Sequence, residues 1–270
     1  MPAPLDVLKF GSSVLQSDSD LPAVVHAIYR HVRRGRRVVA VVSAFAGRTD
    51  RLLERSRRWT KDAAPDAVAQ LLATGEAESA ALTTIALDRA GISACVLPPT
   101  PIVRTEGPLL DAAAVALDAT PLHAALRDHA VVVVPGFVGR DVDTDQTTLL
   151  GRGGSDLTAA FLAGELGADR CVLVKDVEAV HTADPAIDPA ALPFDRLTWS
   201  MAIDVAGVLV QRKAIEVARE RGVSIEVTAC APDRVTRIGR GPTRIGTHRP
   251  ARRPLRVSTA KPIHQTEPRR

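Results

Sequence analysis

Cysteine and long apolar runs are both scarce in this sequence. The three cysteines, Cys95, Cys171 and Cys230, are odd in number and far apart, which argues against a disulfide framework or a zinc site and indicates buried thiols in a reducing compartment. No stretch approaches the roughly 20 uncharged apolar residues that a membrane-spanning helix needs, and the N-terminus has no basic region followed by an apolar stretch. We therefore expect a soluble cytoplasmic protein with no membrane association.

Aromatic residues are absent from the last 40 residues, which are strongly basic. Residues 231–270 hold eleven Lys or Arg against only Asp233 and Glu267, whereas the net charge of the whole chain is +4. Because this segment offers no aromatic platform for bases and no recognisable groove-reading module, we do not expect it to bind nucleic acid. We expect a solvated, partly disordered basic tail over residues 231–270, after one large domain over residues 1–230.

Short apolar stretches alternate with helical patterns throughout residues 1–230. The stretch RVVAVVSA (37–44) is too uniformly apolar for a strand with one solvent-exposed face, and it predicts a central strand of a parallel sheet. Further strands are predicted at DVLKF (6–10), SACVL (93–97), AVVVVPG (130–136), RCVLVKDV (170–177) and, as the last strand, VSIEV (223–227). Such alternation predicts an α/β fold, a three-layer α/β/α sandwich with a mostly parallel central sheet.

Three glycines lie in the segment GRGGSD (151–156), directly before a helical pattern. Glycine permits positive φ and a close approach of the backbone to a ligand, and the start of a helix offers free N–H groups and the positive end of a dipole; together these favour phosphate. In parallel sheets ligands bind beyond the carboxyl ends of the strands, where this loop falls. A plain tight turn at the start of a helix explains the glycines equally well.

A second loop of small residues, Gly11, Ser12 and Ser13, follows Lys9 at the end of the first predicted strand. A lysine beside glycine-rich loops supplies the positioning and the charge neutralisation that phosphoryl transfer requires. A lysine that merely extends from a strand end into solvent is the alternative. Asp156, at the start of the helix after the glycines, could cap N–H groups, orient a lysine or hold Mg²⁺ through water.

Two further charged side chains suit an amino-acid substrate. The planar guanidinium of Arg152 fits a carboxylate. Glu76, which follows Gly75 in a helical pattern, could pair with an ammonium group, although a glutamate in such a place is more often a solvated surface residue.

Six segments resemble, in their order and approximate spacing, the catalytic domain of aspartate kinases. They are VLKFGSSVL, VVAVVSAFAGRTDRLL, GEAESAALTTIAL, VVPGFVGRD, TTLLGRGGSDLTAAFLAGELGADRC and KDVEAVHTADP, and together they span about residues 5–227. The resemblance implies the amino acid kinase fold and ATP-dependent phosphorylation of the β-carboxylate of L-aspartate. The product would be 4-phospho-L-aspartate, on the route to lysine, threonine and methionine, and Mg²⁺ would be carried by ATP rather than by a metal site of the protein.

The resemblance also implies roles by position. Lys9 matches the catalytic lysine that stabilises the transferring phosphoryl group, and Asp156 matches the aspartate that organises the site. The matched aspartate-binding positions are Ser43, Thr49, Glu76 (for the ammonium), Arg152 (for the α-carboxylate) and Phe137. The implied nucleotide-binding positions are Gly11, Ser12, Ser13, Gly153, Gly154, Lys175, Asp176, His181 and Lys213.

The nucleotide side departs from the family pattern more than the aspartate side does. Ser12 replaces a glycine, Lys175 a threonine and His181 a tyrosine, and Val208 stands where a lysine is expected near ATP. Three interpretations stay open: ATP binding is weakened, with Lys175 or Lys213 supplying the lost charge; the phosphate donor differs; or the chain binds aspartate without turnover.

Three functional hypotheses follow in this order: an active aspartate kinase, a non-catalytic aspartate-binding or partner subunit, and a kinase for another amino acid or carboxylate. The family resemblance further implies a homodimer. Because some relatives are fused to homoserine dehydrogenase, that enzyme is a candidate partner. The basic tail is too short and unpatterned for the C-terminal regulatory domain that aspartate kinases usually carry, so we expect none.

Overall fold

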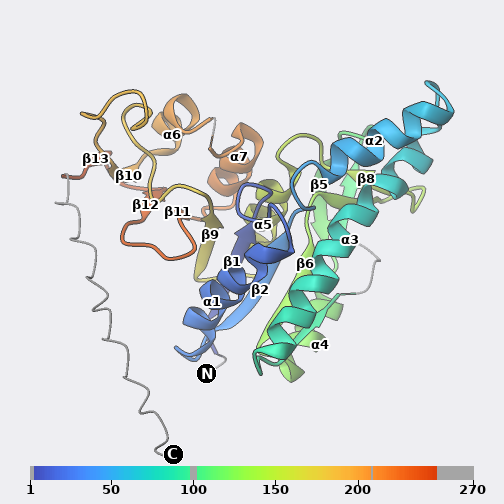
Figure 1. The fold of residues 1–270 in the computed structure, drawn as a ribbon, viewed down its shortest axis with the longest axis horizontal. Helices are drawn as coiled ribbons and strands as arrows, with labels where there is room; N and C mark the ends of the chain where they lie inside the picture. The colour runs from blue at the N-terminus through green and yellow to red at the C-terminus, as the bar shows by residue number, and fades with distance from the viewer. Residues whose placement is uncertain (1–2, 98–101, 208, 248–270) are drawn as a thin grey trace, which may run out of the picture.

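The computed structural model describes residues 3–97, 102–207 and 209–247 of the chain (Figure 1). Its centre is a nine-stranded sheet with the order β13-β10-β12-β11-β9-β1-β2-β6-β3. All pairs from β3 to β11 are parallel, whereas β12 is antiparallel to β11 and β13 is antiparallel to β10. The strands are β1 (Leu5–Phe10), β2 (Arg37–Val42), β3 (Ala94–Val96), β6 (Val131–Pro135), β9 (Arg170–Val174), β10 (Phe194–Leu197), β11 (Ile225–Thr228), β12 (Thr236–Ile238) and β13 (Arg244–Ile245).

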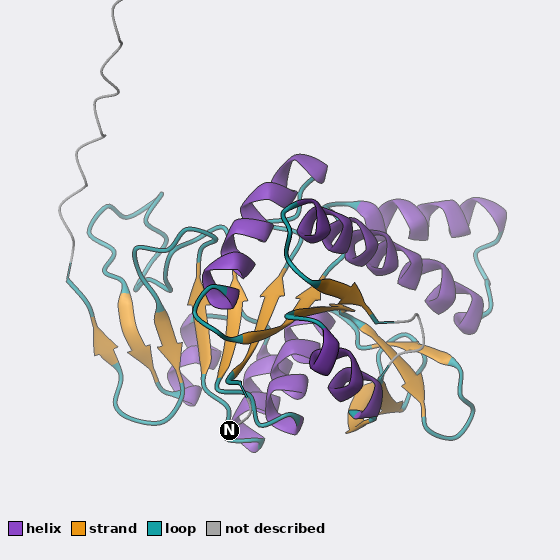
Figure 2. Cartoon of the chain, turned by 90° about the horizontal axis from the view of Figure 1, so that it is seen from below, coloured by secondary structure: helices purple, strands orange, loops and turns teal. Residues whose placement is uncertain are grey.

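Helices cover both faces of this sheet (Figure 2). The uniformly apolar β2 explains why: Val39 and Val41 belong to one buried cluster, and Val38 belongs to another on the opposite face. One face is covered by α1 (Leu21–Val32), which follows the short 3-10 helix η1 (Asp18–Asp20), and by α3 (Pro65–Arg89). The other face is covered by α4 (Thr120–Asp128), α5 (Gly154–Glu165), α6 (Trp199–Val205) and α7 (Arg212–Glu220). The predicted three-layer sandwich, with β2 as a central strand, is confirmed.

Two strands follow the one predicted to be last. β12 and β13 complete the sheet beyond β11, so the expected boundary at residue 230 falls inside the sheet. These strands are only three and two residues long, too short for an apolar pattern to reveal them. Thr236 of β12 is fully buried; its hydroxyl donates to the Phe194 carbonyl (2.6 Å) and accepts from the Val180 N–H (2.9 Å). Residues 248–270 of the expected tail lie outside the described residues.

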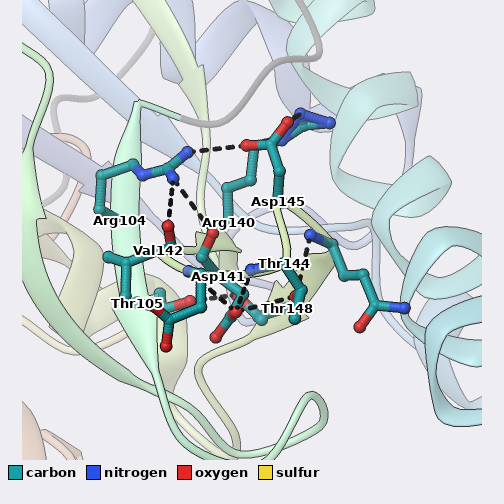
Figure 3. A network of polar contacts seen from close by, with 10 residues as sticks. Arg104, Thr105, Arg140, Asp141, Val142, Thr144, Asp145 and Thr148 are labelled. Atoms are coloured by element: carbon teal, nitrogen blue, oxygen red, sulfur yellow. Dashed lines mark hydrogen bonds and ion pairs between the residues drawn. The ribbon is translucent and has the colours of Figure 1, made fainter.

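A second, four-stranded sheet with the order β5-β4-β7-β8 was not predicted. Its strands are β4 (Val103–Glu106), β5 (Ala113–Leu117), β7 (Val138–Asp141) and β8 (Thr147–Leu149). Strand β10 of the central sheet and α2 (Arg48–Trp59), which packs on α3, were not predicted either. Figure 3 shows the polar contacts that fix the β7–β8 turn: Asp145 accepts from Arg104 (2.9 Å) and Arg140 (3.0 Å), while Asp141 accepts from the Thr144 N–H (2.8 Å). At the other end of this hairpin the Leu150 N–H donates to the Phe137 carbonyl (2.8 Å), which joins Phe137 to the start of the glycine-rich loop.

None of the helices in the described ranges is long and apolar enough to cross a membrane.

Candidate active site

Two lysines and one aspartate meet at the carboxyl end of the parallel sheet. Lys9 of β1 lies opposite Leu173 of β9, so Lys175, two residues further on, points to the same face of the sheet as Lys9. That face is covered by α5, and Asp156 lies in the first turn of α5. Lys9 Nζ is 2.7 Å from Asp156 Oδ1, and Lys175 Nζ is 2.8 Å from Asp156 Oδ2. A single carboxylate thus bridges two ammonium groups.

The three side chains of this cluster are almost completely buried. The exposed fractions are 6% for Lys9, 3% for Asp156 and 8% for Lys175. Burial by itself raises the pKa of Asp156, but the charges and hydrogen bonds of Lys9 and Lys175 outweigh it, and the net shift is downward. Burial, reinforced by the charge of Lys175, lowers the pKa of Lys9 against the opposite effect of Asp156. Asp156 is therefore ionised at neutral pH and cannot serve as a proton donor there.

A cavity of about 750 Å³ opens over this cluster. It lies where four adjacent strands of the sheet end: Lys175 follows β9, Lys9 is in β1, Ser43 follows β2, and Phe137 follows β6. Fourteen of the predicted site residues line it: Lys9, Gly11, Ser12, Ser13, Ser43, Thr49, Glu76, Phe137, Arg152, Gly153, Gly154, Asp156, Lys175 and Asp176. The expectation that the unusual loops gather beyond the strand ends is confirmed.

Two predicted nucleotide-binding residues are not among those that line this cavity. The Nδ1 atom of His181 lies 3.0 Å from the Ala179 carbonyl, and Lys213 Nζ forms a half-exposed ion pair with Asp111 (2.6 Å). Val208 lies outside the described residues. Of the two lysines that could supply a lost positive charge, the structure therefore brings only Lys175 to the cavity.

The glycines of the loop before α5 are required by packing. Gly153, the N-cap of α5, has φ = 76°, and a Cβ atom there would lie 1.9 Å from Cγ of Gln211. A Cβ atom on Gly154 would lie 2.8 Å from Cβ of Leu150. Gly153 and Gly154 therefore leave no room for a side chain, and both form part of the cavity wall beside Asp156.

Glu76 is a buried carboxyl group in the cavity wall, not a surface residue. Its exposed fraction is 3%, and its Oε1 atom accepts a hydrogen bond from the Ala44 N–H (3.2 Å). Its buried Oε2 atom has no hydrogen-bond partner among the described residues. Burial raises the pKa of Glu76 to about 7. A cationic group entering the cavity would satisfy Oε2 and favour the ionised form.

We expect Glu76→Gln to stabilise the protein at pH 8 but not at pH 4. The unfolded chain releases this proton near pH 4.5 and the folded chain only near pH 7, so Glu76 costs stability increasingly as the pH rises between these values. The gain at pH 8 should reach up to roughly 3 kcal/mol. Urea denaturation of both proteins at the two pH values measures it, and an equal effect at both values would contradict the buried, unpaired carboxyl.

The remaining substrate-side residues differ in exposure. Arg152 is exposed at the mouth of the cavity, and Ser43 and Thr49 are half-buried in its wall. Phe137 has a left-handed backbone (φ = 69°), and its N–H donates to Oγ1 of Thr158 (3.1 Å). A non-glycine residue held at positive φ in a cavity wall is a mark of a constrained site.

Four further residues that line the cavity were not predicted. Leu53 and Arg57 of α2 and Val68 and Leu72 of α3 line it, but α2 was not predicted. The only signal was the apolar pair Leu52–Leu53 in an otherwise highly charged segment. Among the described residues, no group of three or more His, Cys, Asp or Glu side chains is arranged to hold a metal ion.

Comparison with known proteins decides the family. The sequence model of the amino acid kinase family matches residues 5–229, most of the chain. The chain belongs to the amino acid kinase family. Among its amino acid kinase relatives, the aspartate kinase of Pseudomonas putida is 32% identical over 227 residues, which cover 83% of this chain and 55% of the relative. The chain thus spans about half the length of the curated relatives that it matches.

Solved structures of amino acid kinases share the fold described above. The aspartate kinase from Synechocystis superposes with a TM-score of 0.76 at 30% identity and covers 88% of this chain, which covers 40% of that protein. Aspartokinase III of E. coli, solved in complex with aspartate and ADP, superposes with a TM-score of 0.74 at 22% identity; the match covers 88% of this chain and 65% of that protein.

Proposed function

We propose that this chain catalyses the ATP-dependent phosphorylation of the β-carboxylate of L-aspartate to 4-phospho-L-aspartate. The observation that carries the proposal is the buried cluster of Lys9, Asp156 and Lys175 under a cavity that also holds the unpaired Glu76 oxygen. The two lysines of the cluster suit a phosphate group, and the buried carboxyl of Glu76 suits the amino group of an amino acid. The names of the relatives, aspartate kinases and aspartokinases, support the same acceptor.

In this proposal the reaction is an in-line transfer. A β-carboxylate oxygen of aspartate forms a bond to the γ-phosphorus while the bond from that phosphorus to the bridging oxygen breaks, and ADP leaves with the electron pair. No proton has to move, so the protein acts by positioning and by neutralising charge. Lys9 faces the transferring group, and Asp156 fixes Lys9. The loops at Gly11–Ser13 and Gly153–Gly154 hold the phosphates, and Mg²⁺ arrives with the nucleotide.

At the aspartate end, Glu76 binds the ammonium group and Arg152 the α-carboxylate, while Ser43, Thr49 and Phe137 shape the space between. Each of these residues lines the cavity. Glu76 in particular has the free acceptor atom that an ammonium group needs.

The test is to measure ADP release by purified protein with Mg-ATP, with and without L-aspartate, and to trap the acyl phosphate with hydroxylamine. We expect aspartate-dependent ADP together with a hydroxamate. Folded protein that forms neither product would contradict the proposal. ADP release with another amino acid or carboxylate, but not with aspartate, would leave a kinase with a different acceptor.

A second candidate, a non-catalytic aspartate-binding subunit, is favoured by one observation. His181, which stands at the position of a tyrosine beside the nucleotide, does not line the cavity. The two candidates differ in whether Mg-ATP binds: a ligand that binds the folded state raises the melting temperature. A shift with aspartate and none with Mg-ATP would support the binding subunit.

We expect Arg152→Ala to raise the KM for aspartate by about 10- to 100-fold with a smaller change in kcat. Its guanidinium is exposed at the cavity mouth and would hold the α-carboxylate, which does not change charge during the reaction. Initial rates over a range of aspartate concentrations measure this, with Arg89→Ala, on the far end of α3, as the surface control. An unchanged KM for aspartate would remove Arg152 from the substrate site.

The homodimer and the homoserine dehydrogenase partner, which the family resemblance implies, stay predictions, and so does the cytoplasmic location expected from the lack of an apolar membrane segment. A homodimer is testable by light scattering, and an association with homoserine dehydrogenase by co-purification. Cytoplasmic location is testable by fractionation.

A further inference from the structure

We propose that Lys175 is a second catalytic lysine, which contacts the transferring phosphoryl group together with Lys9 and is held in place by Asp156. This inference rests on the proposed function and deepens it. It assigns to Lys175 a role in the transition state, beyond general nucleotide binding.

Lys9 and Lys175 both contact Asp156 under the cavity. The β1–β9 register places Lys9 and Lys175 on the same face of the sheet, and the two Asp156 oxygens hold their Nζ atoms at 2.7 and 2.8 Å. Both side chains line the cavity. An oxygen-rich group that approaches Lys9 there therefore also approaches Lys175.

The charges of the buried cluster do not balance. Two ammonium groups and one carboxylate leave the buried cluster with one surplus positive charge. In the described part of the chain, neither Lys9 nor Lys175 has an ion pair with any other acidic group. A buried unpaired charge is costly, so the cluster is electrostatically complete only when an anion lies over it. A transferring phosphoryl group is such an anion.

The nucleotide side of the site departs from the family pattern in its positive charges. Valine stands at residue 208, where the family resemblance implies a lysine, and Lys213, paired with Asp111, is not among the residues that line the cavity. Lys175 is the one lysine besides Lys9 that lines the cavity in the described ranges. Lys175 thus supplies, from the end of β9, a positive charge to the part of the cavity where the phosphates would bind.

Lys175→Met tests the proposal because methionine keeps the length of the apolar stem without the charge. We expect kcat to fall about 100-fold, the usual scale for removing one preorganised donor to a transition state. Lys175→Arg should recover part of the loss, because arginine restores the positive charge. Lys61→Met, on the exposed loop after α2, is the matched control.

Nucleotide binding separates this role from simpler ones. In Lys175→Met the affinity for Mg-ATP should fall at least about 10-fold, while the affinity for Mg-ADP, which lacks the transferring group, should change little. Equal losses for both nucleotides would place Lys175 on the other phosphates and overturn the proposal. A larger loss of Mg-ATP affinity in Lys213→Met than in Lys175→Met would also overturn the proposal.

Thermal unfolding without ligand covers a purely structural role. Lys175→Met leaves Asp156 paired with Lys9 and removes the surplus charge, so the melting temperature should stay at the wild-type value or rise. A marked fall, with unchanged ATP affinity, would mean that Lys175 only supports the fold. Wild-type protein that binds Mg-ATP but does not phosphorylate aspartate would contradict the proposed function alone, because the comparison of ATP with ADP needs no acceptor.

Discussion

Lys9→Ala should reduce aspartate-dependent ADP release about 1,000-fold and leave the protein folded. A donor preorganised at a buried site contributes on this scale, because it faces the charge that moves in the transition state without having to reorganise. Lys9 is 6% exposed and its ammonium group is fixed by Asp156, so it meets both conditions. A coupled assay of ADP release, with both substrates at saturating concentrations, measures this rate.

The fold should survive this substitution because Asp156 keeps its second partner. Lys175 Nζ lies 2.8 Å from Asp156 Oδ2 in the wild-type structure, and the substitution leaves this ion pair to neutralise the carboxylate. Circular dichroism and a melting curve check this point, and Lys61→Met again serves as the surface control. Wild-type turnover in folded Lys9→Ala would refute the mechanism proposed here.

Asp156→Asn should cost about 3 kcal/mol of folding free energy and most of the activity. Removing the carboxylate leaves two ammonium groups side by side in a buried place with no counter-charge, and breaking a buried ion pair from one side is expensive. The unfolded chain would then bind more protons than the folded one, so the loss should shrink as the pH rises. Urea denaturation at neutral and alkaline pH measures both effects.

A double substitution makes this prediction specific. Asp156→Asn combined with Lys175→Met leaves a single buried ammonium group, that of Lys9. The doubly substituted protein should therefore be more stable than the protein with Asp156→Asn alone. Glu216→Gln, which breaks the exposed Arg212–Glu216 pair on α7, should cost less than about 1 kcal/mol. If Asp156→Asn costs no more than Glu216→Gln, the buried cluster does not have the importance assigned to it.

The sequence predicted the parts of the fold whose patterns are long and uniform. β2 and the other parallel strands are apolar on both faces because helices cover both sides, and that pattern is visible without a structure. The second sheet was not predicted because its strands are short and partly exposed, as the alanine-rich β5 illustrates. β12 was not predicted because it is only three residues long and one of its two buried side chains is the polar Thr236, whose hydroxyl makes two hydrogen bonds.

The sequence predicted which residues line the candidate site, but not which of them contact one another. Spacing and family resemblance brought Lys9, Asp156 and Glu76 forward, and the structure places all three in one cavity. No pattern in the sequence indicated that Asp156 would bridge two lysines, because the contact depends on the register between β1 and β9. The placement of Lys213 on Asp111 is likewise a tertiary contact that the chain's local sequence does not reveal.

The position of β1 between β2 and β9 determines when the site can form as the chain folds. β1 pairs with β2 soon after both exist, but its pairing with β9 waits until most of the domain has been made. Contacts between segments so distant in the chain form slowly, because the loop between them must close first. Until then Lys9 does not have Lys175 beside it. Nascent chains that end before β9 should therefore be inert towards ATP, and catalytic competence should appear only with the final steps of folding.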